Sequence, residues 1–183
     1  MDTYAETMDF SNSYEWLNYL MDEYGEKLTN LAYGYCKDWG KAEEIVQDVF
    51  ITCFHQYKNR HKIKSYKAWI YRITINRAKD SLRTAWFKRV SVQNELFAHL
   101  TSNTSTPERN LESNETSEQL ATAIMQLPLK YREMIILFYY EELSIQEISE
   151  LINMNENTVK TRLNRGREKL KPLLERGDYY ERL

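Results

Sequence analysis

The sequence predicts an all-α protein in which a flexible linker joins two small helical domains. Apolar residues recur at spacings of three and four, the period of an amphipathic helix. Glycine and proline are scarce, at 5 and 3 of 183 residues. Residues 90–118 are instead rich in Ser, Thr, Asn and Glu, as linkers are. We expect an acidic N-terminal extension (1–23), a first domain (24–89), the linker (90–118), a second domain (119–176) and a tail (177–183).

The first two helices are predicted from their apolar faces. Residues 1–13 are polar, and we expect them to be frayed. From Tyr14 to about residues 36–40, apolar residues return at helical spacing. Asp38 is a candidate N-cap for a second helix over residues 41–57. The broad apolar face of that helix carries Ala42, Ile45, Val46, Val49, Phe50, Cys53 and Phe54.

A polar face lies opposite on the second helix, where Glu44, Gln47 and Asp48 come together. Two carboxylates and an amide at this spacing can contact one partner. The same pattern is also typical of a solvated helix surface. The residues alone leave both interpretations open.

A basic stretch leads into the third helix. Residues 58–67 (KNRHKIKSYK) lack periodicity and predict a loop, and a helix then begins near Ser65 or Tyr66 and runs to about residue 87. We expect its buried stripe to be Ala68, Tyr71, Ile75, Ala78, Leu82 and Ala85. Another face carries Trp69, Arg72, Asn76, Lys79 and Arg83. An aromatic ring, an amide and spaced cations suit a single-stranded nucleic acid; alternatively, Trp69 packs in the core and the cations are solvated.

The second domain has the pattern of a helix-turn-helix. We expect a helix over residues 119–127, then Pro128, then a very apolar helix over residues 131–140. Residues 143–170 follow as two helices joined by a tight turn. Within them Ser144 and Glu147, three residues apart, are typical of a capping box and mark the first of these helices.

The turn and the second helix of the helix-turn-helix follow from residue type. Asn153 tolerates left-handed backbone, and Asn155 can cap the second helix. The predicted inward side of that helix is Val159, Leu163, Gly166 and Leu170. The predicted outward side is Lys160, Asn164, Arg167 and Lys171, beside Thr161 and Arg165. These outward residues can reach phosphates and base edges, although a charged outer face is also common on solvated helical hairpins.

The net charge of −2 conceals two separated basic blocks. Residues 57–89 hold 11 basic and 1 acidic residues (+10), and residues 157–183 hold 8 and 4 (+4). By contrast, residues 1–56 hold 3 basic and 11 acidic residues (−8). Two basic blocks on an otherwise acidic chain suggest two contacts with one polyanion.

Several classes of protein are disfavoured. We do not expect the protein to be an enzyme, because the chain has no Gly-rich phosphate loop and none of its histidines is paired with a plausible nucleophile. Cys36 and Cys53, with His55 and His61 nearby, match no compact zinc pattern, so we expect no metal, no cofactor and reduced thiols. The longest apolar stretch, residues 134–140, is too short to span a bilayer, so we expect a cytoplasmic protein without membrane insertion.

Three stretches resemble the extracytoplasmic-function sigma factors, the smallest group of the sigma-70 family of bacterial transcription initiation factors. Residues 42–50 (AEEIVQDVF) resemble the polymerase-binding helix, and residues 68–80 (AWIYRITINRAKD) resemble the helix that engages the minus-ten promoter element. Residues 127–170 resemble the domain that reads the minus-thirty-five element. The resemblance covers about residues 24–174 apart from the linker. It implies that the two domains are sigma regions 2 and 4.

The resemblance also implies site residues. Core polymerase would be bound by Glu44, Gln47, Asp48 and Phe50. Minus-ten DNA, as a melted single strand, would be bound by Ser65, Tyr66, Trp69, Arg72, Asn76, Lys79 and Arg83. Minus-thirty-five DNA would be bound by Thr158, Lys160, Thr161, Asn164, Arg165 and Arg167.

The implied function is that of an alternative sigma factor, which binds core RNA polymerase and directs initiation at specific promoters. The implied partners are the clamp helices of the polymerase's largest subunit, the flap of its second-largest subunit, promoter DNA and a membrane-anchored anti-sigma factor. One alternative is a dimeric helix-turn-helix repressor or activator on duplex DNA, which gives no task to the Trp69 face. Another is an adaptor that binds only proteins, which leaves both basic blocks idle.

Overall fold

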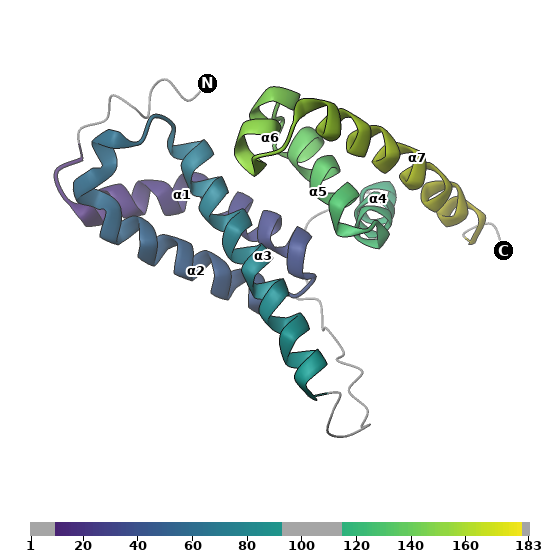
Figure 1. The fold of residues 1–183 in the computed structure, drawn as a ribbon, viewed down its shortest axis with the longest axis horizontal. Helices are drawn as coiled ribbons and strands as arrows, with labels where there is room; N and C mark the ends of the chain where they lie inside the picture. The colour runs from purple at the N-terminus through teal and green to yellow at the C-terminus, as the bar shows by residue number, and fades with distance from the viewer. Residues whose placement is uncertain (1–9, 93–114, 181–183) are drawn as a thin grey trace. The chain divides into compact units, whose positions relative to one another are not determined.

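The computed structural model describes residues 10–92 and 115–180, with side chains described for 10–84 and 118–175. The chain divides into two compact units, Met1–Ser105 and Thr106–Leu183. Every regular element in the described residues is a helix, so the predicted all-α class is confirmed (Figure 1). Most of the predicted linker lies outside the described residues, and helices extend into both of its ends.

The described residues of the first unit form three α-helices and one short 3-10 helix. These are α1 (Ser13–Cys36), α2 (Trp39–Gln56), the 3-10 helix η2 (Tyr57–Lys62) and α3 (Tyr66–Val92). Each of the three α-helices packs against the other two. Figure 1 shows the C-terminal part of α3 extending past the ends of α1 and α2.

Side-chain caps set the starts of the first two helices. The Asn12 carboxamide oxygen accepts hydrogen bonds from the backbone N–H groups of Tyr14 and Glu15, both at 3.0 Å. Lys37 then ends α1 in the left-handed region (φ 59°). The predicted cap at Asp38 is confirmed, because its carboxylate accepts from the N–H of Lys41 at 2.9 Å.

The prediction of a frayed N-terminal stretch is wrong from Phe10 onward. The Phe10 side chain is only 5% exposed, and its ring centroid lies 5.3 Å from that of Tyr19. The division expected between residues 23 and 24 falls inside α1, whose Trp16 and Leu20 are fully buried. Periodicity did not reveal Phe10 because its contacts come from outside its own segment.

Two details of the basic stretch and of α3 also differ from expectation. Residues 58–62, predicted as part of a loop, belong to the 3-10 helix η2 that begins at Tyr57. Ala68 is exposed, whereas Ile70 and Thr74 are fully buried with Tyr71 and Ile75. The buried face is wider than the predicted stripe because α3 packs against two helices. The hydroxyl of Thr74 is satisfied by donating to the carbonyl of Ile70 at 2.9 Å.

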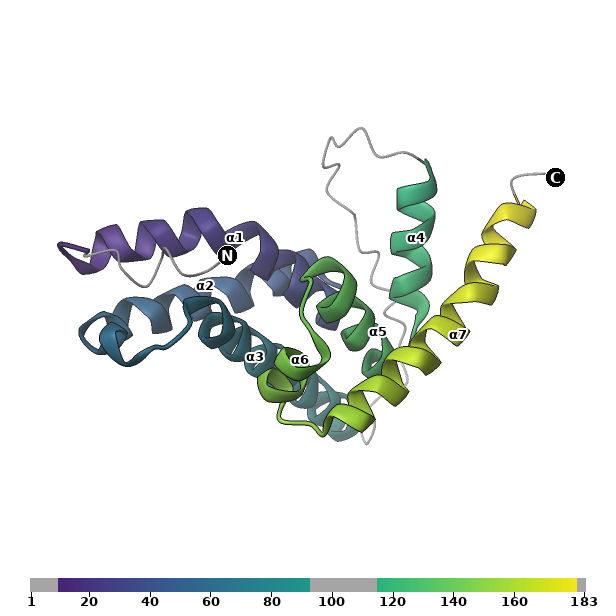
Figure 2. The ribbon, with the colours of Figure 1, turned by 90° about the horizontal axis from the view of Figure 1, so that it is seen from above.

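The second unit contains α4 (Glu115–Gln126), α5 (Leu129–Ile135), the π-helical turn η3 (Ile136–Tyr140), α6 (Ile145–Ile152) and α7 (Glu156–Tyr180). The expected apolar helix over residues 131–140 is therefore α5 continued by a wider turn. The helices α4, α5 and α6 all pack against α7, and Figure 2 shows α7 running on past α5 and α6. The core of this unit includes Leu127, Met134, Leu137 and Ile148.

Cys53 makes the stability of the first unit sensitive to alkaline pH. The thiol is fully buried, and burial raises its pKa from 9.0 to about 12. Above pH ~9 the thiol ionises in the unfolded chain but not in the folded chain. The unfolded chain then binds fewer protons, so the free energy of unfolding should fall by up to ~1.4 kcal/mol per pH unit as pH rises toward about 12.

Urea unfolding at a series of alkaline pH values checks this prediction. The Cys53→Ala variant is the reference, because it keeps every other group that titrates in the same range. We expect a shallower decline of stability in that variant than in the parent protein. Equal slopes in the two proteins would rule out Cys53 as the source.

Candidate nucleic-acid interface

The helix-turn-helix forms through the local signals that predicted it. The Ser144 hydroxyl accepts from the N–H of Glu147 at 3.2 Å, and the Glu147 carboxylate accepts from the N–H of Ser144 at 2.8 Å, which completes the capping box. Asn153 has the left-handed backbone of a turn (φ 52°). The Asn155 side chain accepts from the N–H of Asn157 at 2.8 Å as α7 begins. These predictions are confirmed.

The inward and outward sides of α7 also agree with their predicted residues. Val159 and Leu163 are buried, at 0% and 2% exposure, and Gly166 is buried beside them. All six residues proposed to meet the minus-thirty-five element are exposed: Thr158, Lys160, Thr161, Asn164, Arg165 and Arg167. The structure therefore gathers them on the solvent side of one helix.

Arg167 is held more tightly than the sequence indicates. Its Nε donates to the Tyr139 hydroxyl at 2.8 Å, and its Nη1 donates to the Asn164 carboxamide oxygen at 3.2 Å. The guanidinium also lies 5.7 Å from the Phe138 ring centroid and 5.6 Å from that of Tyr139. The side chain of Arg167 is thus pre-oriented, and so is that of Asn164.

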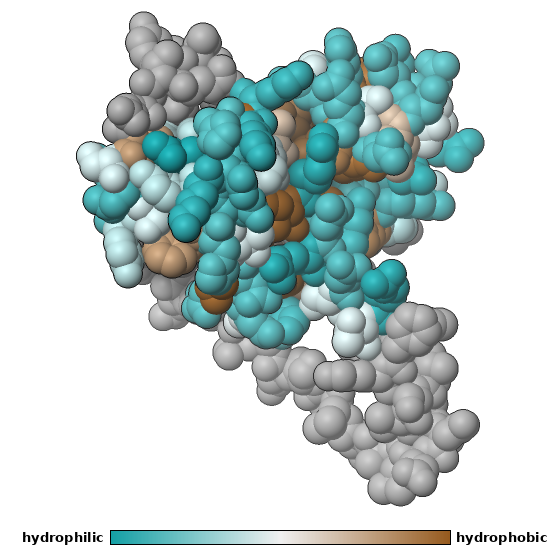
Figure 3. All heavy atoms as spheres, turned by 60° about the vertical axis from the view of Figure 1, so that its left-hand side comes forward, coloured by the Kyte–Doolittle hydropathy of each residue, from teal (hydrophilic) through white to brown (hydrophobic). Residues whose placement is uncertain are grey.

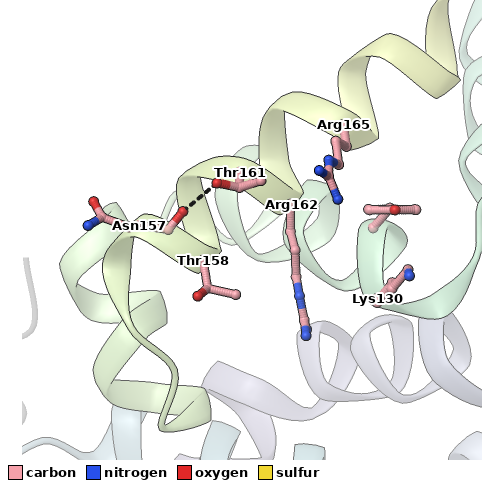
Figure 4. Close-up of a pocket in the computed structure, with 7 residues that line it drawn as sticks. Lys130, Asn157, Thr158, Thr161, Arg162 and Arg165 are labelled. Atoms are coloured by element: carbon pink, nitrogen blue, oxygen red, sulfur yellow. Dashed lines mark hydrogen bonds between the residues drawn. The ribbon is translucent and has the colours of Figure 1, made fainter.

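A basic pocket opens between the first half of α7 and the start of α5 (Figure 4). Its volume is about 380 Å³. Figure 4 shows Arg162 and Arg165 projecting from α7 on the side where Lys130 lies, and Thr161 donating to the Asn157 carbonyl. The lining residues are Lys130, Tyr131, Asn157, Thr158, Thr161, Arg162 and Arg165.

Four lining residues were absent from the sequence-based site, namely Lys130, Tyr131, Asn157 and Arg162. Lys130 and Tyr131 belong to α5, so the period of α7 gave no sign of them. Arg162 lies on the flank of α7 and is half-buried. Its charge in the basic block was the one available signal, but that signal did not place it in a pocket.

The pKa of the Tyr131 hydroxyl indicates a positive electrostatic potential in this pocket. Its ring is buried, at 7% exposure, but the hydroxyl reaches the lining. Partial desolvation raises its pKa, but the charges and hydrogen bonds of Lys130 and Arg165 outweigh that effect, so the pKa of Tyr131 lies below its ordinary value. A site that favours loss of a proton from a phenol also favours a bound anion.

The predicted strand-binding face of α3 is mostly exposed. Arg72, Asn76 and Arg83 are exposed, and Lys79 is half-buried with its ammonium 6.0 Å from the Tyr35 ring centroid. Arg83 also pairs with Asp80 at 3.2 Å. These side chains form one line along the helix that can follow a phosphate backbone.

The residues that open α3 are more buried than expected. The Ser65 hydroxyl accepts from the N–H of Ala68 at 3.2 Å, so it caps the helix. Tyr66 is only 8% exposed, with its ring centroid 5.8 Å from that of Trp16. Trp69 is half-buried and stacks on Trp16 at 6.1 Å. Trp69 therefore packs in part against Trp16 and stays in part accessible, and its contact with a nucleic acid remains a prediction.

The four predicted polymerase-binding residues of α2 do not share one side of the helix. Glu44, Gln47 and Asp48 are exposed, whereas Phe50 is on the buried side, at 9% exposure. Asp48 pairs with Arg77 of α3 at 3.3 Å, and that guanidinium also donates to the Thr52 hydroxyl at 2.8 Å. Both charged groups are largely exposed, so the pair itself is worth only ~0–1 kcal/mol.

Exposure alone does not single out these surfaces, because hydrophilic residues cover most of the face shown in Figure 3. Among the described residues, no three His, Cys, Asp or Glu side chains are grouped as a metal site. No helix in that part of the chain is long and apolar enough to cross a membrane.

Both units match family models. Residues 20–88 match sigma-70 region 2, and residues 117–170 match sigma-70 region 4. The ECF RNA polymerase sigma factor SigW of Bacillus subtilis (strain 168) is 32% identical over 162 residues, which cover 85% of this chain and 87% of the relative. RNA polymerase sigma factor SigV of the same organism is 31% identical over 135 residues, covering 74% and 76%.

Two solved structures have a similar fold. The sigma factor RpoE from Bartonella quintana, in complex with the anti-sigma factor NepR, has a TM-score of 0.64 at 21% identity and covers 86% of this chain and 96% of its own. CnrH, in complex with the cytosolic domain of CnrY, has a TM-score of 0.59 at 21% identity and covers 90% of each chain. At this identity the structures support the fold alone.

Proposed function

The chain belongs to the extracytoplasmic-function sigma factors of the sigma-70 family, and from that premise we propose that three of its faces direct core RNA polymerase to specific promoters. Membership makes it a transcription initiation factor and not an enzyme. The observation that carries the proposal is the exposure of predicted contact residues on both units, within residues 20–88 and 117–170 that match regions 2 and 4.

The exposed face of α2 is the proposed polymerase contact. Glu44, Gln47 and Asp48 lie within one helical turn and present two carboxylates and an amide to the clamp helices of the largest subunit. Phe50 acts indirectly, by packing α2 into the unit. Asp48 also pairs with Arg77 of α3, so an ion pair links the proposed polymerase contact to the proposed strand-binding helix.

The face of α3 is the proposed contact with the melted minus-ten strand. Asn76 supplies an amide for a base edge, and Arg72 and Arg83 supply charges for phosphates. The accessible side of Trp69 offers a ring on which a base can stack. Tyr66 supports this surface from below, because its own ring is buried.

The face of α7 is the proposed contact with the minus-thirty-five duplex. We place α7 in the major groove, with Thr158, Thr161 and Arg165 near base edges and backbone. The pocket beside it receives one DNA phosphate between Lys130 and Arg162. Phosphate contacts position the protein, whereas base contacts give specificity.

The partners follow from this arrangement. Each DNA contact alone is weak and salt-dependent, so specificity arises when the holoenzyme holds both units on one promoter. We also propose contact with the flap of the second-largest subunit, action in the cytoplasm and inhibition by a membrane-anchored anti-sigma factor. The similar structure of RpoE contains the anti-sigma factor NepR, and that of CnrH contains the cytosolic domain of CnrY, which is consistent with a protein inhibitor.

Run-off transcription from genomic fragments tests the function. Purified bacterial core polymerase should give new start sites only with this protein. Gln47→Ala/Asp48→Ala should weaken them through lost core binding, and Asn76→Ala should weaken them without that loss, each by roughly tenfold or more, the equivalent of ~1.4 kcal/mol.

Matched controls remove similar side chains from the exposed surface of α1. Asp22→Ala/Glu23→Ala and Asn30→Ala should leave start-site use unchanged. If no start site depends on the protein, and it instead binds a palindromic duplex as a dimer, the proposal fails in favour of a helix-turn-helix regulator.

A further inference from the structure

Phe10 lies ahead of the part of the chain that matches region 2, which begins at residue 20. It also precedes the Asn12 cap of α1, yet its side chain is buried against Tyr19. A buried aromatic ring anchors the backbone around it, because exposing the ring to water again is unfavourable. The backbone of Phe10 is therefore held in a defined place.

The carbonyl oxygen of Phe10 receives two hydrogen bonds from the 3-10 helix η2. The Tyr57 hydroxyl donates to it at 2.7 Å, and Nη2 of Arg60 donates to it at 3.3 Å. The Arg60 guanidinium also lies 4.2 Å from the Tyr57 ring centroid. Two side chains of η2 thus converge on one backbone oxygen nearly 50 residues earlier in the sequence.

The helix η2 has little stability of its own. It is a six-residue 3-10 helix with no buried residue and no side-chain cap. The hydrogen-bond geometry of such helices is poor, and runs longer than three or four residues are uncommon. Its shape therefore depends on contacts outside it, namely the Phe10 carbonyl and the packing of Tyr57 against Trp16, with ring centroids 6.0 Å apart.

The same N-terminal segment also contacts the other end of the basic stretch. The ring centroid of Trp16 lies 5.8 Å from that of Tyr66 and 6.1 Å from that of Trp69, where α3 begins. Residues 63–65 connect η2 to that point. Residues 10–16 therefore contact the basic stretch on both sides of residues 63–65.

We propose that residues 10–16 form a brace that fixes residues 57–65 in the position from which they meet the melted minus-ten strand, with Phe10 as a positioning residue. This inference rests on the proposed function of the α3 face. Without the brace, residues 57–65 have to become ordered when the strand binds. The conformational entropy lost in that step makes promoter opening less favourable. Binding to core polymerase through α2 does not require the brace.

Two variants of the full chain remove the brace in different ways. Phe10→Ala removes the buried anchor, and Tyr57→Phe removes one hydrogen bond to the Phe10 carbonyl while keeping the ring against Trp16. Met21→Ala is the matched control, since it shortens an exposed apolar side chain of α1. With holoenzyme, the permanganate reactivity of melted thymines should fall about tenfold for Phe10→Ala and by a smaller factor for Tyr57→Phe.

Two further readouts separate positioning from general unfolding. Competition for core polymerase should be unchanged in both variants, and trypsin should cut after Lys58, Lys62 and Lys64 faster than in the parent protein. Parent-like opening and parent-like cleavage in both variants would overturn the brace. An equal loss of core binding and promoter opening in Phe10→Ala, with Tyr57→Phe like the parent, would overturn it as well, because Phe10 would then be ordinary core.

A failure of the proposed function looks different. In that case the parent protein itself would open no promoter, or Asn76→Ala would open promoters as well as the parent does. The brace is tested separately, by the two outcomes given above for the Phe10 and Tyr57 variants of a parent protein that does open promoters.

Discussion

Replacing Gly166 by leucine is expected to destabilise the second unit, whereas replacing it by alanine is expected to be nearly neutral. A Cβ at this position would lie 3.3 Å from Cγ1 and 3.4 Å from Cδ1 of Ile135, and 3.5 Å from the Tyr131 carbonyl oxygen. Gly166 thus sits where α7 crosses α5. The small residue lets the two helices approach closely.

The alanine and leucine variants differ in what has to move. Alanine adds only the Cβ, and a shift of a few tenths of an ångström by the flexible end of Ile135 relieves it. That cost is offset by alanine's better helix propensity, worth ~0.8–1.0 kcal/mol over glycine. Leucine adds three more carbons against the buried Ile135 and the backbone of α5, and overpacking of this kind costs ~1–3 kcal/mol or more.

The distribution of tryptophan allows the loss to be assigned to one unit. All four tryptophans, at positions 16, 39, 69 and 86, belong to the first unit. Gly166→Leu should therefore lower the thermal midpoint of part of the circular-dichroism signal, by roughly 4–8 °C per kcal/mol. The tryptophan fluorescence transition should stay where it is in the parent. A leucine variant that melts like the alanine variant would show that α5 and α7 do not need glycine at their crossing.

Local signals predicted much of this fold correctly. The capping box at Ser144, the turn at Asn153 and the caps at Asp38 and Asn155 each involve residues within a few positions of one another. Local hydrogen bonds of this kind form whatever the rest of the chain does. For the same reason the two sides of α7 were predicted well, because helical period alone decides which residues share a face.

Contacts between distant segments were not predictable in the same way. The burial of Phe10 and the packing of Tyr66 on Trp16 depend on helices meeting at particular angles. Nothing within one segment specifies those angles. The loop predicted over residues 58–67 was wrong for residues 58–62 for the same reason, since η2 is stabilised by Phe10 and Trp16 and not by its own periodicity.

The basic pocket is the clearest example of what sequence could not give. Lys130 and Arg162 are 32 positions apart, and each by itself is an ordinary surface cation. Their juxtaposition in one lining, with the lowered pKa of Tyr131 beside them, shows a positive potential concentrated at one point. This concentration predicts a measurable effect on DNA binding.

Removing one cation from the pocket should reduce duplex binding and its dependence on salt together. A cation that neutralises one phosphate releases condensed counterions, and the slope of log K against log salt changes by ~0.9 for each such contact. For Lys130→Gln and Arg162→Gln we expect the slope to fall by about one each, with roughly the same factor lost on every duplex sequence. Arg165→Gln should in addition weaken discrimination between the selected minus-thirty-five sequence and a scrambled one.

Fluorescence anisotropy of the full chain with a labelled minus-thirty-five duplex, over a range of low salt concentrations, makes this measurement. Lys27→Gln is the matched control, because it removes one positive charge from an exposed position of α1, outside the pocket lining and outside the proposed contact faces. If the control reduces the slope as much as Arg162→Gln does, the effect is that of net charge and the pocket holds no phosphate. If only the pocket variants reduce the salt slope, the phosphate lies between α5 and α7. DNA binding by this unit then depends on the same close crossing of the two helices that Gly166 permits.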